Sequence, residues 1–156
     1  MGCGKSSTGR ELASVLGVSF VDLDELVVSR EGRSIPEMFR DGEPVFRAAE
    51  TAALRSLLEP LPEEPLVIAL GGGTLGSECS LSLVLERTRS VWLRAGLETI
   101  RKRVDENDAG RPLFRDAERL YSERIPVYSR AEFSVDTDGL TPREVACVIA
   151  GMIGES

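Results

Sequence analysis

One short motif near the N-terminus constrains the fold of this chain most: Gly2-Cys3-Gly4-Lys5-Ser6-Ser7, followed by a helix-like pattern over 8–16. Glycines allow successive backbone N–H groups to turn toward a phosphate, and the N-terminus of a following helix adds about half a positive charge. In such a loop Lys5 reaches the β- and γ-phosphates, and the Ser6 hydroxyl binds Mg²⁺. The motif therefore predicts a phosphate-binding loop. A Gly/Ser-rich N-terminal tail is the alternative.

The complete loop pattern, Gly-x-x-x-x-Gly-Lys-Ser/Thr, places its first glycine two residues before Met1. Such a loop normally connects a strand to a helix, so the motif also predicts an apolar strand that is missing ahead of it. We expect the natural product to begin about ten residues upstream, with that strand and the missing loop glycine. We also expect the 156-residue chain to be marginally stable, which puts its activity in doubt.

The composition of the chain argues against several classes of partner and of catalytic chemistry. With 19 basic and 26 acidic side chains, the net charge is −7, which argues against a nucleic-acid or anionic-membrane surface. No apolar run approaches the roughly 20 residues of a membrane span, and no signal peptide is evident, so we expect a cytoplasmic protein. The chain has no histidine and three scattered cysteines. Acid–base chemistry must therefore come from Asp, Glu or Lys.

Apolar segments of strand length alternate with helical patterns along the chain. We expect strands at 17–22, 66–70, 90–93 and 133–136. We expect helices at 8–16, 26–28, 35–39, 45–58, 80–87, from about 97, 116–123 and 141–153. This alternation predicts one α/β domain over residues 1–156, with a mainly parallel sheet covered by helices on both faces. Ligands bind such sheets beyond the carboxyl ends of the strands.

Acidic residues and glycines follow two of the expected strands. Asp22 and Asp24 flank Leu23, and the period of two in a strand would place both carboxylates on one side, as a metal ligand beside a base. A helix N-cap at Asp24 is the alternative. Three glycines in a row, Gly71-Gly72-Gly73, lose much backbone entropy on folding. A ligand that approaches the backbone closely, or unusual backbone torsions, would explain why they are present. A tight turn is the alternative there.

Arginines provide the candidate anion-binding groups. Arg47 and Glu50 have helical i, i+3 spacing, which by itself predicts an ordinary surface pair. Arg111 follows a polar segment, and Arg124 precedes Ile125-Pro126. A planar guanidinium suits phosphate and carboxylate groups, although solvated surface charge is the default for each arginine alone.

Seven segments together carry a family resemblance: Gly2–Arg10, Phe20–Asp24, Gly32–Ile35, Phe46–Glu50, Gly71–Gly73, Arg111–Leu113 and Arg124–Tyr128. In this order and spacing the chain resembles the shikimate kinases over essentially its whole length. The resemblance implies a three-layer P-loop kinase fold of nucleoside-monophosphate-kinase type, with a parallel sheet whose first strand is missing here and a lid at about 107–119. It implies phosphorylation of the 3-hydroxyl of shikimate by ATP with Mg²⁺, and we expect a monomer.

The resemblance also implies a role for each matching residue. For ATP, the implied residues are Gly2, Cys3, Gly4, Lys5, Ser6, Ser7, Arg103 and Arg111. For shikimate, they are Asp24, Arg47, Gly71, Gly72, Gly73 and Arg124. Ser6 and Asp22 would hold Mg²⁺, and Lys5, Asp24 and Arg111 would be catalytic, with Asp24 as the candidate base and Arg111 on the γ-phosphate.

Two other functions remain open at this level. A related P-loop kinase, for example of gluconate, would share Lys5 and Ser6 but would not need Arg47 and Arg124 on one carboxylate. A non-catalytic nucleotide-binding relative would explain the missing strand.

Overall fold

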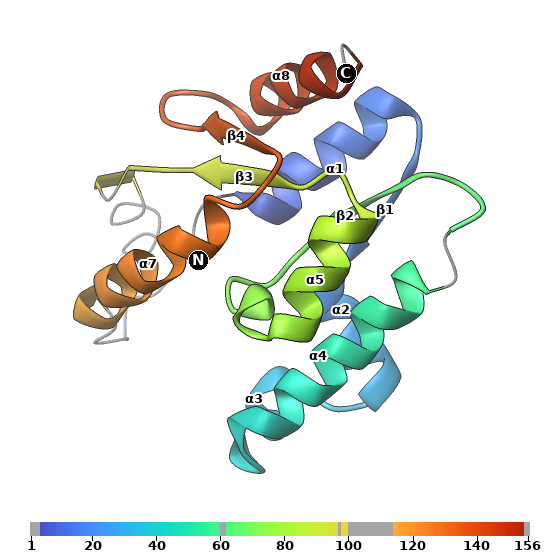
Figure 1. Cartoon of the computed structure of the whole chain (residues 1–156), viewed down its shortest axis with the longest axis vertical. Helices are drawn as coiled ribbons and strands as arrows, with labels where there is room; N and C mark the ends of the chain where they lie inside the picture. The colour runs from blue at the N-terminus through green and yellow to red at the C-terminus, as the bar shows by residue number, and fades with distance from the viewer. Residues whose placement is uncertain (1–3, 60–61, 97, 100–113, 155–156) are drawn as a thin grey trace.

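The computed structural model describes residues 4–59, 62–96, 98–99 and 114–154 of the chain (Figure 1). Several predicted site residues lie outside this part, namely Gly2, Cys3, Arg103 and Arg111. So do the first seven residues of the expected lid, 107–113. The assignment of residues 1–156 to one domain remains a prediction.

Helices and strands alternate along the described chain, as the sequence predicts. The helices are α1 (Lys5–Leu16), α2 (Leu23–Glu31), α3 (Ile35–Arg40), α4 (Glu43–Leu58), α5 (Glu78–Arg87), α7 (Phe114–Tyr128) and α8 (Pro142–Gly154), and η1 (Thr74–Gly76) is a short 3-10 helix. The strands are β1 (Ser19–Asp22), β2 (Leu66–Ala69), β3 (Val91–Arg94) and β4 (Phe133–Asp136). The expected helix over 116–123 is longer than predicted and continues through Pro126.

The described strands pair in parallel. β1 pairs with β2 and β3 with β4, so the described residues contain two two-stranded sheets. Figure 1 shows α8 beside the β3–β4 pair and α2, α4 and α5 on the side of the β1–β2 pair. The predicted α/β class with parallel strands and flanking helices is confirmed, whereas the described strands do not form the expected continuous sheet.

A large apolar cavity is lined by the facing strands of the two sheets. Its volume is about 520 Å³, and its walls include 66–69 of β2 and 91–93 of β3. Leu12, Leu54 and Ile149 contribute apolar side chains from the helices. Each of these strands is paired with another described strand on one side only. The cavity therefore lies along two strand edges whose backbone groups have no partner strand among the described residues.

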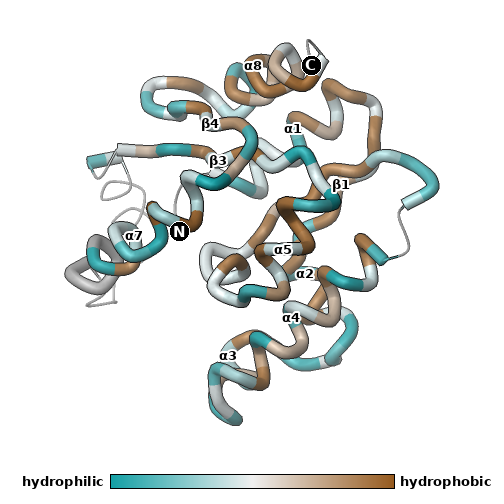
Figure 2. Tube along the Cα trace, in the orientation of Figure 1, coloured by the Kyte–Doolittle hydropathy of each residue, from teal (hydrophilic) through white to brown (hydrophobic). Residues whose placement is uncertain are grey.

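The buried side chains form two clusters. One, beneath α2, α4 and α5, consists of Leu23, Val27, Met38, Phe46, Ala53, Leu54, Leu58, Leu83 and Val84. The other, between α1, β4 and α8, consists of Leu12, Val135, Val145, Ala146 and Ile149. Hydrophobic residues, brown in Figure 2, are prominent on α5 and α8, which contribute to one cluster each.

Local sequence signals explain where several helices begin. A capping box begins α8, because the Glu144 carboxylate accepts the Thr141 N–H at 2.8 Å and Thr141 Oγ1 accepts the Glu144 N–H at 3.3 Å. Pro142 occupies the first helical position, where its missing N–H is not needed. Within the described residues, none of the helices combines the length and apolar character that crossing a membrane requires.

Candidate active site

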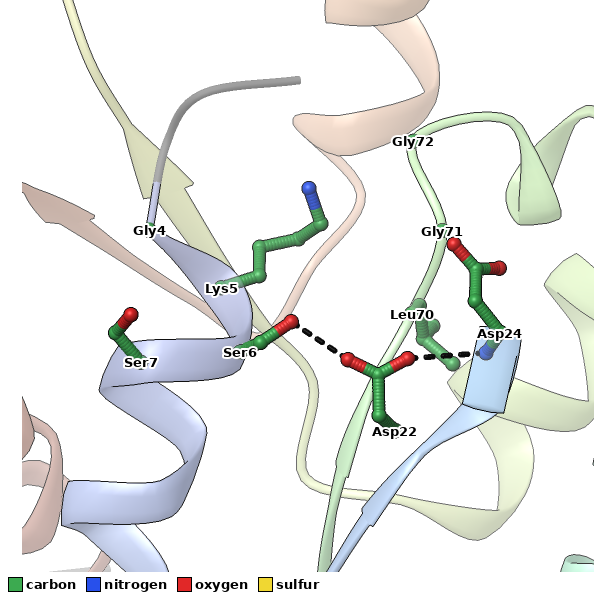
Figure 3. Close-up of a pocket in the computed structure, with 9 residues that line it drawn as sticks. All are labelled: Gly4, Lys5, Ser6, Ser7, Asp22, Asp24, Leu70, Gly71 and Gly72. Carbon is green, nitrogen blue, oxygen red and sulfur yellow. Dashed lines mark hydrogen bonds between the residues drawn. The ribbon is translucent and has the colours of Figure 1, made fainter. Parts of the chain in front are cut away.

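A pocket of about 340 Å³ lies where the N-terminus of α1 faces the carboxyl ends of β1 and β2. β1 and β2 end level with each other, because Asp22 is in register with Ala69. The segments that follow the two strands therefore meet. The lining residues, drawn in Figure 3, are Gly4, Lys5, Ser6, Ser7, Asp22, Asp24, Leu70, Gly71 and Gly72.

The described part of the phosphate-binding motif, Gly4 to Ser7, forms the N-cap and the first residues of α1. Gly4 has a left-handed backbone, with φ of 73°, and its carbonyl accepts the N–H of Thr8 at 2.8 Å to begin the helix. Among the described residues, no side chain caps α1, and its first turn holds no acidic residue. The N–H groups and the positive dipole end of α1 are thus available for an anion. Lys5 lies at this helix end and lines the pocket (Figure 3).

Ser6 and Asp22 form a hydroxyl–carboxylate pair across the pocket. The Ser6 hydroxyl donates to Asp22 Oδ2 at 2.6 Å. Mg²⁺ is usually held by one or two carboxylates together with substrate phosphates and waters, not by an all-protein cage. In the part of the chain that the structure describes, no cluster of three His, Cys, Asp or Glu side chains offers such a cage. The Ser6–Asp22 pair beside the helix N-terminus therefore fits a nucleotide-bound Mg²⁺.

The structure corrects two expectations about the acidic residues. β1 ends at Asp22 and α2 begins at Leu23, so Asp24 lies in the first turn of a helix and strand periodicity does not relate the two carboxylates. The N-cap is Asp22, whose Oδ1 accepts the N–H groups of Asp24 at 3.0 Å and Glu25 at 3.4 Å. The N-cap interpretation was thus assigned to the wrong aspartate. Both carboxylates nevertheless line the pocket.

Asp24 has the most unusual electrostatic environment in the pocket. Burial raises the pKa of its carboxyl group, and the nearby carboxylates of Asp22 and Glu50 raise it further, while Lys5 and Arg47 lower it. Asp24 Oδ1 is buried and has no hydrogen-bond partner among the described residues. A buried acceptor without a partner is costly, so a ligand hydroxyl at this position would satisfy it.

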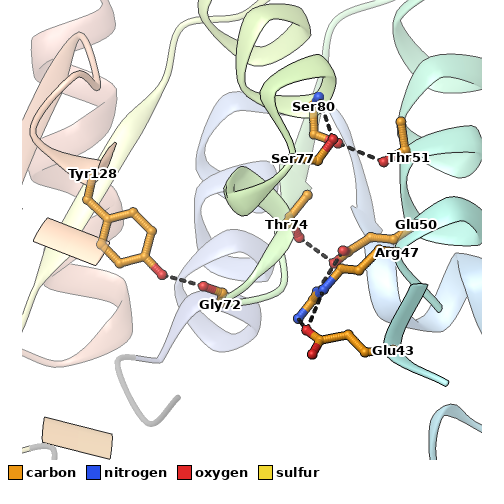
Figure 4. Close-up of polar contacts among 9 residues, drawn as sticks. All are labelled: Glu43, Arg47, Glu50, Thr51, Gly72, Thr74, Ser77, Ser80 and Tyr128. Atoms are coloured by element: carbon orange, nitrogen blue, oxygen red, sulfur yellow. Dashed lines mark hydrogen bonds and ion pairs between the residues drawn. The ribbon is translucent and has the colours of Figure 1, made fainter. Parts of the chain in front are cut away.

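A buried network around Glu50, drawn in Figure 4, lies close to Asp24, because the Glu50 carboxylate contributes to the raised pKa of Asp24. The Glu50 side chain is only 2% exposed, and its carboxylate accepts hydrogen bonds from Thr74 Oγ1 at 2.5 Å and from Arg47 Nη1 at 2.8 Å. The expectation that Arg47 and Glu50 form an ordinary surface pair is therefore wrong. The sequence carried a signal for this, because Glu50 has helical spacing with the buried Phe46 and Leu54 and so faces the core.

Gly71 and Gly73, which follow β2, lie where a side chain would collide with neighbouring side chains of the site. An added Cβ at Gly71 would lie 2.9 Å from Glu50 Oε1, 3.0 Å from Asp24 Oδ1 and 3.1 Å from Thr74 Oγ1. At Gly73 it would lie 2.8 Å from Arg47 Cζ and 2.9 Å from Nη1. Neither glycine has a positive φ, so special torsions are not the reason for them. The sequence reasoning did not identify Glu50 and Thr74 as site residues.

α7 contacts the same glycine segment from the other side. The Tyr128 hydroxyl donates to the Gly72 carbonyl at 2.5 Å (Figure 4), and the Tyr128 ring packs on Trp92 with a centroid separation of 6.0 Å. Arg124, one turn earlier in α7, is half-buried and lines the larger cavity. Arg47 and Arg124 are both absent from the lining of the smaller pocket. Their predicted contact with one carboxylate therefore stays a prediction.

Parallel strands with flanking helices, a phosphate loop at a helix N-terminus and a facing Ser–Asp pair define the chain as a P-loop phosphotransferase. The family model described as "Shikimate kinase" matches residues 1–153. The chain belongs to the shikimate kinase family, which confirms the resemblance seen in the sequence.

Individual relatives agree with this assignment. The chain is 42% identical to the shikimate kinase of Ruegeria pomeroyi over 151 residues, covering 92% of this chain and 75% of that protein. It is 42% identical to the shikimate kinase of Caulobacter vibrioides over 153 residues, covering 94% of this chain and 74% of the relative. The structure of Acinetobacter baumannii shikimate kinase in complex with shikimate matches with a TM-score of 0.89 and 31% identity, covering 99% of this chain and 89% of that one.

Proposed function

We propose that this site transfers the γ-phosphoryl group of ATP to the 3-hydroxyl of shikimate. The observation that carries the proposal is the position of Asp24 Oδ1, a buried acceptor without a partner among the described residues, in the same pocket as Lys5 and Ser6. A hydroxylated substrate that donates to this oxygen would lie directly beside the phosphate loop. The shikimate bound in the Acinetobacter relative supports this choice of substrate.

The residues of the pocket have separable roles in this proposal. The Gly2–Ser7 loop and the α1 N-terminus bind the ATP phosphates, with Lys5 on the β- and γ-phosphates. Ser6 and Asp22 would hold Mg²⁺, which neutralises phosphate charge. Asp24 accepts the hydrogen bond of the substrate hydroxyl and takes its proton. Its raised pKa makes the Asp24 carboxylate a better proton acceptor than an ordinary aspartate.

Other residues hold the substrate and complete the site. Arg47 and Arg124 bind the shikimate carboxylate, and the Gly71–Gly73 amides line the same site. Arg103 and Arg111 lie outside the described residues and keep the roles that the resemblance gives them, on ATP and the γ-phosphate. Little covalent chemistry is required of the protein, since phosphoryl transfer depends mainly on positioning and charge stabilisation.

We further propose that a complete sheet contains one more strand, leading into Gly4. The apolar cavity of about 520 Å³ supports this, since its walls include β2 and β3, each paired with a described strand on one side only. A strand there would join the two strand pairs into one five-stranded sheet and fix the phosphate loop from its N-terminal side. The protein acts as a cytoplasmic monomer in this proposal.

The test is ADP release with MgATP and a panel of hydroxylated acids. We expect shikimate alone to stimulate release. Stimulation by gluconate would favour the related-kinase alternative. ATP binding without turnover on any acid would favour the non-catalytic alternative.

A further inference from the structure

Arg47 is paired with two glutamates of very different character. Glu50, on one side of its guanidinium, is 2% exposed and is held in place by Thr74. Glu43, on the other side, is 62% exposed (Figure 4). One Glu43 oxygen accepts from both Nε at 3.2 Å and Nη2 at 3.1 Å. The edge of the Arg47 guanidinium formed by Nε and Nη2, which can bind a carboxylate, is therefore already occupied by the Glu43 carboxylate.

The Glu43 contact is the weaker and more exchangeable of the two. Among the described residues, Arg47 is the sole hydrogen-bond partner of the Glu43 side chain. Exposed ion pairs of this kind contribute little, because water solvates both partners well. Glu50 cannot leave as easily, since release would leave its buried carboxylate without a charged partner. Any anion that competes for Arg47 would thus displace Glu43 and leave Glu50 in place.

Charge counting favours exchange over addition. One guanidinium with two carboxylates already carries a net charge of −1. With Arg124 on the same substrate carboxylate, adding the ligand while Glu43 stays would leave the group at −1, whereas releasing Glu43 makes it neutral. Asp24 adds a further carboxylate nearby. A Cβ built on Gly71 would lie 3.0 Å from Asp24 Oδ1 and 2.9 Å from Glu50 Oε1, so these two oxygens are close to each other. Releasing Glu43 into solvent avoids this repulsion and frees Nε and Nη2 for the incoming group.

We propose that Glu43 is a placeholder for the substrate carboxylate: it holds the Nε–Nη2 edge of Arg47 in the free protein and is displaced when a carboxylated substrate binds. This inference rests on the proposed role of Arg47 as the carboxylate-binding residue. Glu43 lowers the affinity for carboxylated ligands, because each must first break the Glu43–Arg47 pair. A ligand without a carboxylate does not compete with Glu43.

The test compares shikimate with its methyl ester, which lacks the carboxylate, by calorimetric titration of the wild-type chain and the Glu43→Gln variant. We expect Glu43→Gln to bind shikimate roughly 1.5- to 5-fold more tightly, the range that loss of one exposed ion pair allows. Affinity for the methyl ester should not change. The gain for shikimate should shrink at high salt, which already screens the pair in the wild-type protein.

Glu59→Gln is the matched control, because Glu59 also forms an exposed i, i+4 pair in this part of the chain, with Arg55 at 3.4 Å. It should leave both affinities unchanged. Unchanged or weaker shikimate binding by Glu43→Gln would overturn the proposal, since weaker binding would mean that Glu43 clamps Arg47 for the ligand. Arg47→Ala tests the role of Arg47 in carboxylate binding separately from the role of Glu43. If that variant binds shikimate and its ester as the wild type does, the assigned role of Arg47 itself is wrong.

Discussion

Arg47→Ala should destabilise the fold as well as weaken substrate binding, because Arg47 is the charged partner of a buried carboxylate. Without it, the Glu50 side chain, which is 2% exposed, keeps the Thr74 hydroxyl as its one hydrogen-bond partner among the described residues. Breaking a fully buried ion pair typically costs 3–5 kcal/mol, and because the Arg47 side chain is 26% exposed we expect about 2–4 kcal/mol here. For a chain of this size that corresponds to a fall in Tm of roughly 5–15 °C.

The assay is thermal and urea unfolding of three variants. Arg55→Ala, on the same helix, is the control, since Arg55 is 54% exposed and its loss should cost less than about 1 kcal/mol. Arg47→Ala combined with Glu50→Gln should recover much of the stability, because the amide carries no charge to bury. If Arg47→Ala unfolds like Arg55→Ala, or if the second substitution restores nothing, the buried-network argument is wrong.

Three further predictions follow from the site. Asp24→Asn should reduce turnover about 10²-fold or more with ATP binding and Tm retained; near-normal turnover would remove Asp24 from the chemistry. Gly73→Ala should raise the KM for shikimate roughly 10- to 150-fold by displacing Arg47, a loss of about 1.5–3 kcal/mol. A methyl group at Gly76 would meet no atom of the described residues within 4 Å, so Gly76→Ala should leave the KM unchanged, and equal effects would refute the steric argument. A chain extended ahead of Met1 by an apolar strand of about six residues, with the loop glycine two residues before Met1, should melt higher and bind MgATP more tightly than the 156-residue chain, and identical values would make the strand dispensable.

Local patterns predicted most of the elements because their causes are local. The apolar run before Gly71 forms β2, and the Thr141–Glu144 spacing forms a capping box, since each depends on residues a few positions apart. The position of the pocket could also be predicted, from the carboxyl ends of the strands. Parallel strands place those ends at one edge whatever the details of packing.

The network around Arg47 could not be predicted in this way. Thr74 and Glu50 are 24 residues apart, and their hydrogen bond depends on how the glycine segment packs on α4. Spacing alone therefore suggested a surface pair for Arg47 and Glu50. Asp24 was placed at the end of a strand because Asp22 and Asp24 are both residues that favour a helix N-cap. The residue types alone do not show which of the two caps α2.

In the proposed reaction, this pocket phosphorylates shikimate at the 3-hydroxyl. The most direct test is ³¹P NMR of the product formed from shikimate and MgATP, with Asp24→Asn as a control that should slow product formation. A new phosphate monoester on the 3-hydroxyl, formed in step with ADP, is the predicted result. Release of inorganic phosphate with shikimate unchanged, or a phosphate on another hydroxyl, would contradict the account.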